Sequence, residues 1–145
     1  MSEQGLEVLD SSLQKTHEWL NHLAQLGHLE KGDAYKVLRA VLHTLRDRLP
    51  PEHAVHLAAQ LPIFLRGVFY EGWDLDATPI KLHRAEFLDT VRSRLVSGRF
   101  LDPERVTREV LLTTAHFVSG GEMDKLRHCF PADLQDLWPE LLQAH

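Results

Sequence analysis

An internal repeat is the feature of this sequence that most restricts what it can fold into. When residues 33–69 are aligned with residues 102–138, at an offset of 69, nine of the 37 positions carry the same residue. Unrelated sequences of ordinary composition would share roughly two or three. The nine pairs are Asp33/Asp102, Val37/Val106, Arg39/Arg108, Val41/Val110, Leu42/Leu111, Thr44/Thr113, Leu57/Leu126, Pro62/Pro131 and Leu65/Leu134. This pattern predicts a duplicated helical unit.

Many of the other paired positions are apolar in both halves, which indicates that the repeat preserves a core. An offset of 68 extends the repeat upstream and places Glu18-Trp19-Leu20-Asn21 on Glu86-Phe87-Leu88-Asp89. A unit of about 70 residues buries too little surface to be comfortably stable alone. We therefore expect one domain over residues 1–145, in which the two halves pack about a pseudo-two-fold axis.

The sequence periodicity predicts an all-α fold. No segment alternates apolar and polar residues as a strand does, and the β-branched residues fall at helical spacings. Caps, glycines and prolines predict about eight helices, arranged as two tandem four-helix repeats over 11–72 and 83–142 with a linker at 73–82. The expected helices are 11–26, 33–49, 52–61, 62–72, 83–96, 102–118, 122–130 and one that starts at 131. The first helix has Leu13, Trp19, Leu20, Leu23 and Leu26 near its predicted buried face.

Five short motifs point to a family. They are Ala-Ala-Gln-Leu-Pro (58–62), Tyr-Glu-Gly-Trp (70–73), Glu-Phe-Leu (86–88), Ser-Gly-Gly-Glu (119–122) and Asp-Leu-Trp-Pro (136–139). Together they resemble the bacterial family called domain of unknown function 2267, over nearly everything from His17 to Pro139. One departure is Cys129-Phe130-Pro131, where the second half of the family often reads Gln-Leu-Pro. The resemblance implies a shared helical fold, and it implies no activity, substrate or cofactor because the family has none established.

The net charge argues against a general nucleic-acid binder. The chain carries −5, whereas that class usually needs a basic surface to displace counterions from phosphates. Residues 81–108 are an exception, because seven Lys and Arg residues stand there against four Asp and Glu residues. Weak nucleic-acid binding through the basic segment 92–108 is therefore one alternative function. Its candidate residues are Arg92, Arg94, Arg99, Arg105 and Arg108.

The cysteine count and the N-terminus indicate a cytoplasmic protein. The single Cys129 cannot form a disulfide within the chain, and MSEQGLEVLDSS lacks the basic start and the apolar stretch of a signal peptide. The uncharged run from His53 to Leu65 is too short and too polar to span a bilayer. We expect no membrane span.

No complete catalytic or metal-binding motif is present. His53 and His56 in Glu52-His53-x-x-His56 share a helical face and are the candidate metal ligands. A closed zinc site needs four donors and a catalytic site needs three plus water, so we predict no cofactor, and a solvated helix face is the simpler interpretation. Cys129 follows His128 directly, and adjacent helical residues point apart, which argues against an activated thiol. An enzyme or metal-binding protein with a site at the seam between the repeats is the second alternative.

The linker holds the most distinctive candidates for binding. Tyr70, Trp73 and Lys81 stand in an aromatic-rich stretch that has no counterpart in the other half. Aromatic anchors of this kind are enriched in interface hot spots, although the favoured interpretation is that the Trp73 ring packs across the seam between the halves. The leading interpretation is a non-enzymatic protein-interaction module that binds an unknown protein partner or self-associates as a homodimer.

Overall fold

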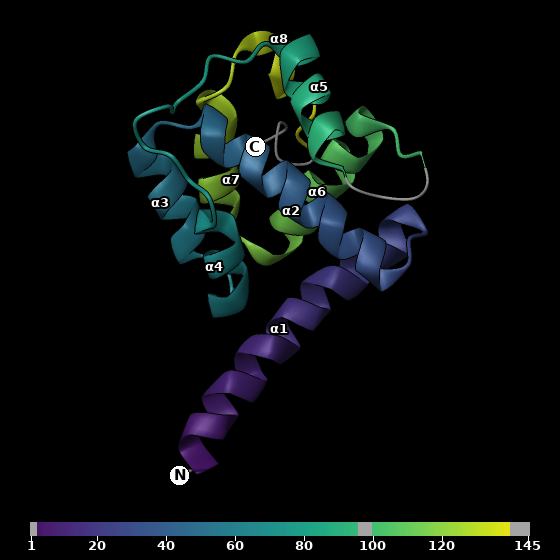
Figure 1. The fold of residues 1–145 in the computed structure, drawn as a ribbon, viewed down its shortest axis with the longest axis vertical. Coiled ribbons are helices and arrows are strands. Elements are labelled where there is room, and N and C mark those ends of the chain that lie inside the picture. Colours follow the sequence, from purple (N-terminus) through teal and green to yellow (C-terminus); the bar gives the residue numbers. More distant parts are fainter. Residues whose placement is uncertain (1–2, 96–99, 140–145) are drawn as a thin grey trace.

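A computed structural model of the chain describes residues 3–95 and 100–139, and every regular element in that part is a helix (Figure 1). The helices are α1 (Glu3–Gly27), α2 (Lys31–Arg48), α3 (Pro51–Ala59), α4 (Ile63–Tyr70), α5 (Arg84–Arg94), α6 (Pro103–Phe117), α7 (Gly120–His128) and α8 (Ala132–Gln135). The all-α prediction is confirmed. The arrangement as two tandem repeats about a two-fold axis stays a prediction.

Local chemistry explains where several helices begin. Pro51 occupies the first turn of α3, where its missing N–H costs nothing. The side chain of Asp102 accepts a hydrogen bond from the backbone N–H of Arg105 and so caps α6, which has Pro103 in its first turn. The Ser119 hydroxyl accepts from the N–H of Glu122 at the start of α7. The starts of α3 and α6 agree with the prediction to within one residue, whereas α7 was predicted at 122–130 and begins at Gly120 because Ser119 caps it.

The first helix differs from its prediction in where it begins and in which residues it buries. It begins at Glu3 instead of Ser11, and its N-terminal part projects away from the body of the molecule (Figure 1). Leu13 and Leu26 were predicted near the buried face, and this was wrong, because they are 46% and 37% exposed. The first residue of α1 that is described as buried is Thr16.

The second helix forms the centre of the body. It contacts α1, α4, α5 and α6 and crosses the middle of the molecule in Figure 1. Its buried residues run continuously from Val37 to Asp47 except for Arg39. All the other helices add side chains to one hydrophobic core, for example Leu23, Phe69, Phe87, Val110 and Met123.

A buried ionic network ties three helices together. The Arg46 Nη1 group donates to the backbone oxygens of Phe69 (2.8 Å), near the end of α4, and of Glu71 (2.7 Å), the residue that follows it. Its Nε donates to Asp47 Oδ1 (2.8 Å), and the other Asp47 oxygen accepts from Arg94 of α5 (2.6 Å). The network therefore holds α4 and α5 against the end of α2.

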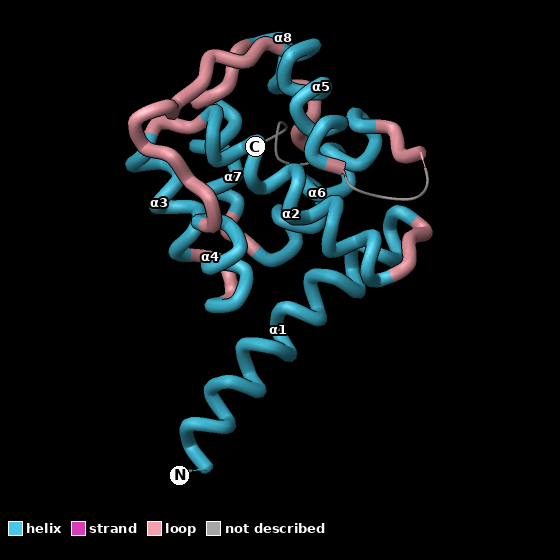
Figure 2. The backbone as a smooth tube through the Cα atoms, viewed as in Figure 1, coloured by secondary structure: helices cyan, strands magenta, loops and turns pink. Residues whose placement is uncertain are grey.

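The predicted linker is a well-anchored loop between α4 and α5 (Figure 2). The N–H of Ile80 donates to the backbone oxygen of Asp47 (2.8 Å). Arg48 Nε donates to the backbone oxygen of Leu82 (3.1 Å), and Leu82 is buried. The loop is thus fixed to the C-terminal end of α2 along its second half.

Candidate functional site

The structure brings two of the three linker candidates together. The rings of Tyr70 and Trp73 stack, with centroids 5.6 Å apart, and both are half-buried against the core. The Trp73 indole N–H donates to the Thr78 hydroxyl (3.2 Å) inside the same loop. Lys81 is exposed further along the loop. Since the polar atom of Trp73 is already used within the loop, this stack stabilises the linker whether or not it contacts a partner.

The two candidate metal ligands line a hollow between α3 and α7. Glu52, His53 and His56 of α3 face Glu122 and Lys125 of α7 there. Glu122 is only 6% exposed, and its Oε1 has no hydrogen-bond partner among the described residues. No group of three His, Cys, Asp or Glu side chains in the described part of the chain is placed to hold a metal ion. Lys125 adds a positive charge that opposes cation binding.

The environment of Cys129 disfavours the thiolate. Burial raises the pKa of this thiol, and the negative charges of Glu122 and Glu52 raise it further, whereas Arg48 lowers it. The Sγ atom lies 3.3 Å from the backbone oxygen of Lys125, to which it donates. A nucleophilic cysteine needs the opposite surroundings. Cys129 therefore has the environment of a structural residue.

Carboxylates neutralise the described arginines of the basic segment. Arg92 pairs with Asp89 (3.0 Å), and Arg94 pairs with the buried Asp47. Arg105 pairs with Glu109 (3.3 Å), while Arg108 pairs with Asp136 (3.1 Å) and Glu104 (3.5 Å). Arg99 lies outside the described residues. The segment therefore presents less free positive charge to a phosphate backbone than its composition suggested.

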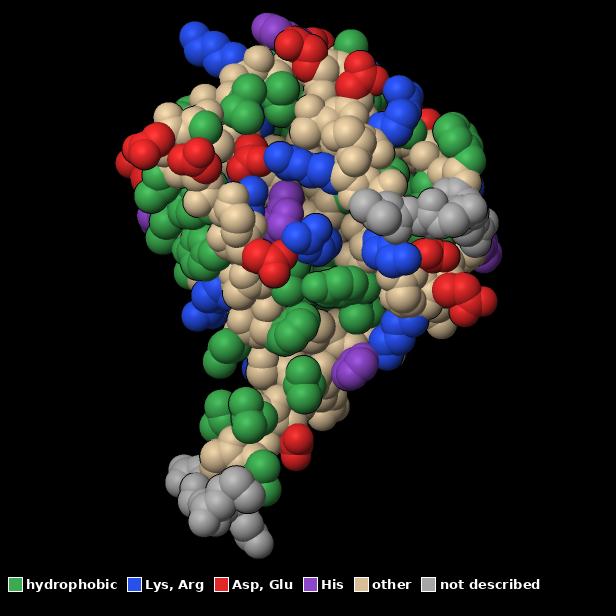
Figure 3. Space-filling view, viewed as in Figure 1, with side chains coloured by type: hydrophobic (Ala, Val, Ile, Leu, Met, Phe, Trp, Pro, Cys, Tyr) green, Lys and Arg blue, Asp and Glu red, His purple; other side chains and the backbone are tan. Residues whose placement is uncertain are grey.

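Sequence reasoning missed a surface on the projecting part of α1. Leu6, Leu9 and Leu13 are 41%, 61% and 46% exposed and form one helical row, which we call the α1 stripe. Hydrophobic side chains are visible along the projecting helix and around its junction with the body (Figure 3). Their spacing of three and four residues was readable in the sequence, but only the structure shows that the described part of the body leaves them exposed.

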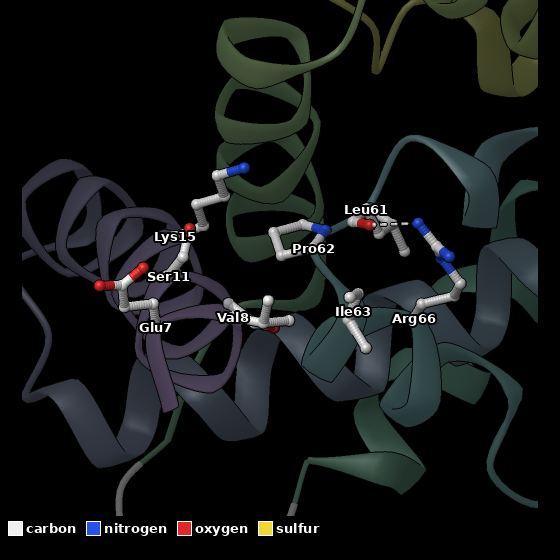
Figure 4. Close-up of a pocket in the computed structure, with 9 residues that line it drawn as sticks. Glu7, Val8, Ser11, Lys15, Leu61, Pro62, Ile63 and Arg66 are labelled. Carbon is white, nitrogen blue, oxygen red and sulfur yellow. Dashed lines mark hydrogen bonds between the residues drawn. The ribbon is translucent and has the colours of Figure 1, made fainter. Parts of the chain in front are cut away.

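A hollow of about 490 Å³ lies where the projecting part of α1 meets the junction of α3 and α4 (Figure 4). We call it the α1–α4 hollow. Val8 of α1 points across it toward Pro62 and Ile63, and the Ser12 hydroxyl accepts from the N–H of Phe64 (3.2 Å) at its edge. The residues that line it are Glu7, Val8, Ser11, Ser12, Lys15, Leu61, Pro62, Ile63 and Arg66.

Comparison with protein families decides the relationship that the motifs suggested. The family described as an uncharacterized conserved protein, DUF2267, matches residues 16–137. The chain belongs to the DUF2267 family. The match begins at Thr16, where α1 enters the body, so the α1 stripe of this DUF2267 chain lies outside the matched residues. None of the curated proteins compared with the chain matches it.

None of the helices described in this DUF2267 protein is both long enough and apolar enough to cross a membrane. The 25-residue α1 has the length, but acidic and other polar residues interrupt its apolar positions.

Proposed function

We propose that this protein is a non-enzymatic protein-interaction module whose contact element is the projecting part of α1. The observation that carries the proposal is the α1 stripe. Its three leucines are exposed, whereas Thr16, Leu20 and Leu23, which continue the same spacing, are buried in the body. A projecting helix of about a dozen residues is marginal in water without tertiary packing, and a contiguous exposed apolar row is typical of an interaction site.

The partner that fits this surface is an amphipathic helix with basic residues beside its apolar face. Residues 3–14 contain three acidic residues and no Lys or Arg, and Asp10 is exposed next to the stripe. A helix that lays leucines against the stripe would therefore gain from Lys or Arg at its flanks. The chain has the single cysteine Cys129 and so no internal disulfide, which fits a reducing compartment, and we expect it to bind its partner in the cytoplasm.

Site-specific photocross-linking in cells tests the proposal. A benzophenone amino acid at Leu9 is expected to capture a protein, because the side chain is 61% exposed in the stripe. The matched control is Leu112, a 41% exposed leucine on α6 in the body, which is expected to capture none. Absence of any protein adduct at Leu9 would contradict the proposal.

The linker is a second predicted contact surface, formed by Tyr70, Trp73 and Lys81. A benzophenone at the exposed Leu75 in the same loop tests it in the same experiment.

The enzyme or metal-binding alternative and the nucleic-acid alternative have less support, since Lys125 opposes a cation in the hollow between α3 and α7 and the described arginines of 92–108 are paired. Metal analysis and a low-salt gel shift test these two.

A further inference from the structure

The side of α1 that lines the α1–α4 hollow carries a charge pattern that is complementary to itself. Glu7, Ser11 and Lys15 are spaced by four residues, so they form one row along the helix. All three are exposed and line the α1–α4 hollow. The row has an acid at one end, a base at the other and a small side chain in the middle. The ion pairs among the described residues include neither Glu7 nor Lys15.

We propose that a second copy of this chain docks at the α1–α4 hollow, with the two α1 helices antiparallel and Ser11 of both copies beside the two-fold axis. The inference rests on the proposed function, since it uses the projecting part of α1 as an interaction element. In this register, a residue of one copy faces a residue of the other copy when their two residue numbers add up to 22. Glu7 of each copy therefore lies opposite Lys15 of the other, which gives two symmetric ion pairs.

Apolar contacts accompany these charges. Val8 and Ile63 are 56% and 61% exposed, and Val8 projects on the side of α1 that faces Pro62 and Ile63 (Figure 4). In the antiparallel pair, Val8 of one copy lies at the level of Gln14 of the other copy, next to the Pro62–Ile63 corner of that other copy. Each copy therefore buries an apolar side chain that is exposed in the monomer.

The symmetry explains why a second copy fits better than another helix. A two-fold contact uses the same patch on both copies, so every contact occurs twice and the assembly closes as a dimer. A different partner would need a base and an acid at the same eight-residue spacing, which this chain already supplies. The small Ser11 at the centre allows the two backbones to approach closely.

The α1 stripe stays free in this dimer. At 100° per residue, Leu9 and Leu13 lie roughly on the opposite side of α1 from Ser11. The two surfaces can therefore be tested separately. A Leu9→Glu variant is expected to keep the dimer and to lose the partner that the α1 stripe binds.

Sedimentation of charge-swapped variants tests the dimer. Glu7→Lys and Lys15→Glu each turn both symmetric ion pairs of the dimer into pairs of like charges. Each variant is therefore expected to raise the dimer dissociation constant about tenfold. The double variant Glu7→Lys/Lys15→Glu restores both pairs in reverse and is expected to return close to the wild-type constant. A monomeric wild-type chain, single variants that leave the constant unchanged, or a double variant that fails to recover would each overturn the proposal.

Cysteine pairs test the direction of the helices. In a Cys129→Ser background, Glu7→Cys mixed with Lys15→Cys is expected to form a disulfide-linked pair faster than either variant does alone. A parallel arrangement would give the reverse result and would overturn the proposal. Protein captured at Leu9 without any cross-link between positions 7 and 15 would leave the proposed function standing and remove the dimer.

Discussion

The side chain of Gln60 accepts a hydrogen bond from the backbone N–H of Ser119, which lies 59 residues further along the chain; the N–O distance is 3.2 Å. Ser119 is the N-cap of α7, so the bond joins the end of α3 to the start of α7. At the offset of 69, Gln60 pairs with Cys129 and Ser119 pairs with Pro50. Proline has no N–H to donate, so the predicted repeat would lack this bond in its other half.

Replacing Gln60 with alanine is expected to lower the free energy of unfolding by about 1 kcal/mol, because the Ser119 N–H loses its acceptor. Gln60→Glu keeps an acceptor oxygen and should cost less. The control is Cys129→Gln, which should bring no gain, since Pro50 offers no donor. Urea denaturation measures all three, and an unchanged midpoint for Gln60→Ala would show that solvent replaces the bond fully.

Asp47 is the residue whose loss should damage the body most. It lies between Arg46, which is 3% exposed, and Arg94. Asp47→Ala leaves a buried guanidinium without its carboxylate and is expected to cost about 3–5 kcal/mol. The comparison is Asp89→Ala, which breaks the exposed pair with Arg92 and should cost less than about 1 kcal/mol. Similar costs for the two variants would mean that the network stabilises the fold no more than a surface pair does.

Helix boundaries were predictable where one residue determines the backbone locally. Pro51 and Asp102 act through a missing N–H and a side-chain cap, and α3 and α6 start beside them. These effects extend over three or four residues, so they can be read without the tertiary structure. The stacking of Tyr70 on Trp73 was not predicted, because the sequence left Trp73 either packing across the seam between the halves or facing a partner.

What covers a helix face could not be read from the sequence. Leu13 and Leu23 have compatible helical spacing, yet Leu13 is 46% exposed and Leu23 is fully buried. Periodicity identifies which residues share a face and does not say whether another element packs on it. The candidate sites could not be predicted from the sequence for the same reason. His53 lies near Glu122, and Val8 lies near Ile63, because segments that are distant in the sequence come together.

Cys129 is expected to react with a disulfide reagent such as DTNB more slowly in the folded protein than in urea. The physical reason is that burial, followed by the charge of Glu122, raises the pKa of the thiol and so lowers the thiolate fraction. Glu122→Gln removes the acidic charge that raises this pKa more and should speed the reaction. Arg48→Gln should slow it, because Arg48 lowers this pKa. A folded protein that reacts as fast as the unfolded chain would contradict this account.

Stability should fall as the pH is lowered from 7 to 5, because two histidines favour their neutral forms in the folded state. Burial lowers the pKa of His22, and so does the ring of His116, stacked on it with centroids 4.5 Å apart. Burial also lowers the pKa of His43, with further contributions from Arg46, Arg39 and Arg94, although its bond to Val68 acts in the opposite direction.

The sign follows from proton linkage. An unfolded histidine titrates near pH 6.5, so below that pH the unfolded state binds protons that the folded state resists. Stability is therefore complete above about pH 6.5 and decreases as the pH falls through the lowered pKa values. Urea midpoints measured from pH 8 to pH 5 should show this decline. His22→Gln should flatten it, whereas His56→Gln, at an exposed position on α3, should not, and a wild-type midpoint independent of pH would contradict the prediction.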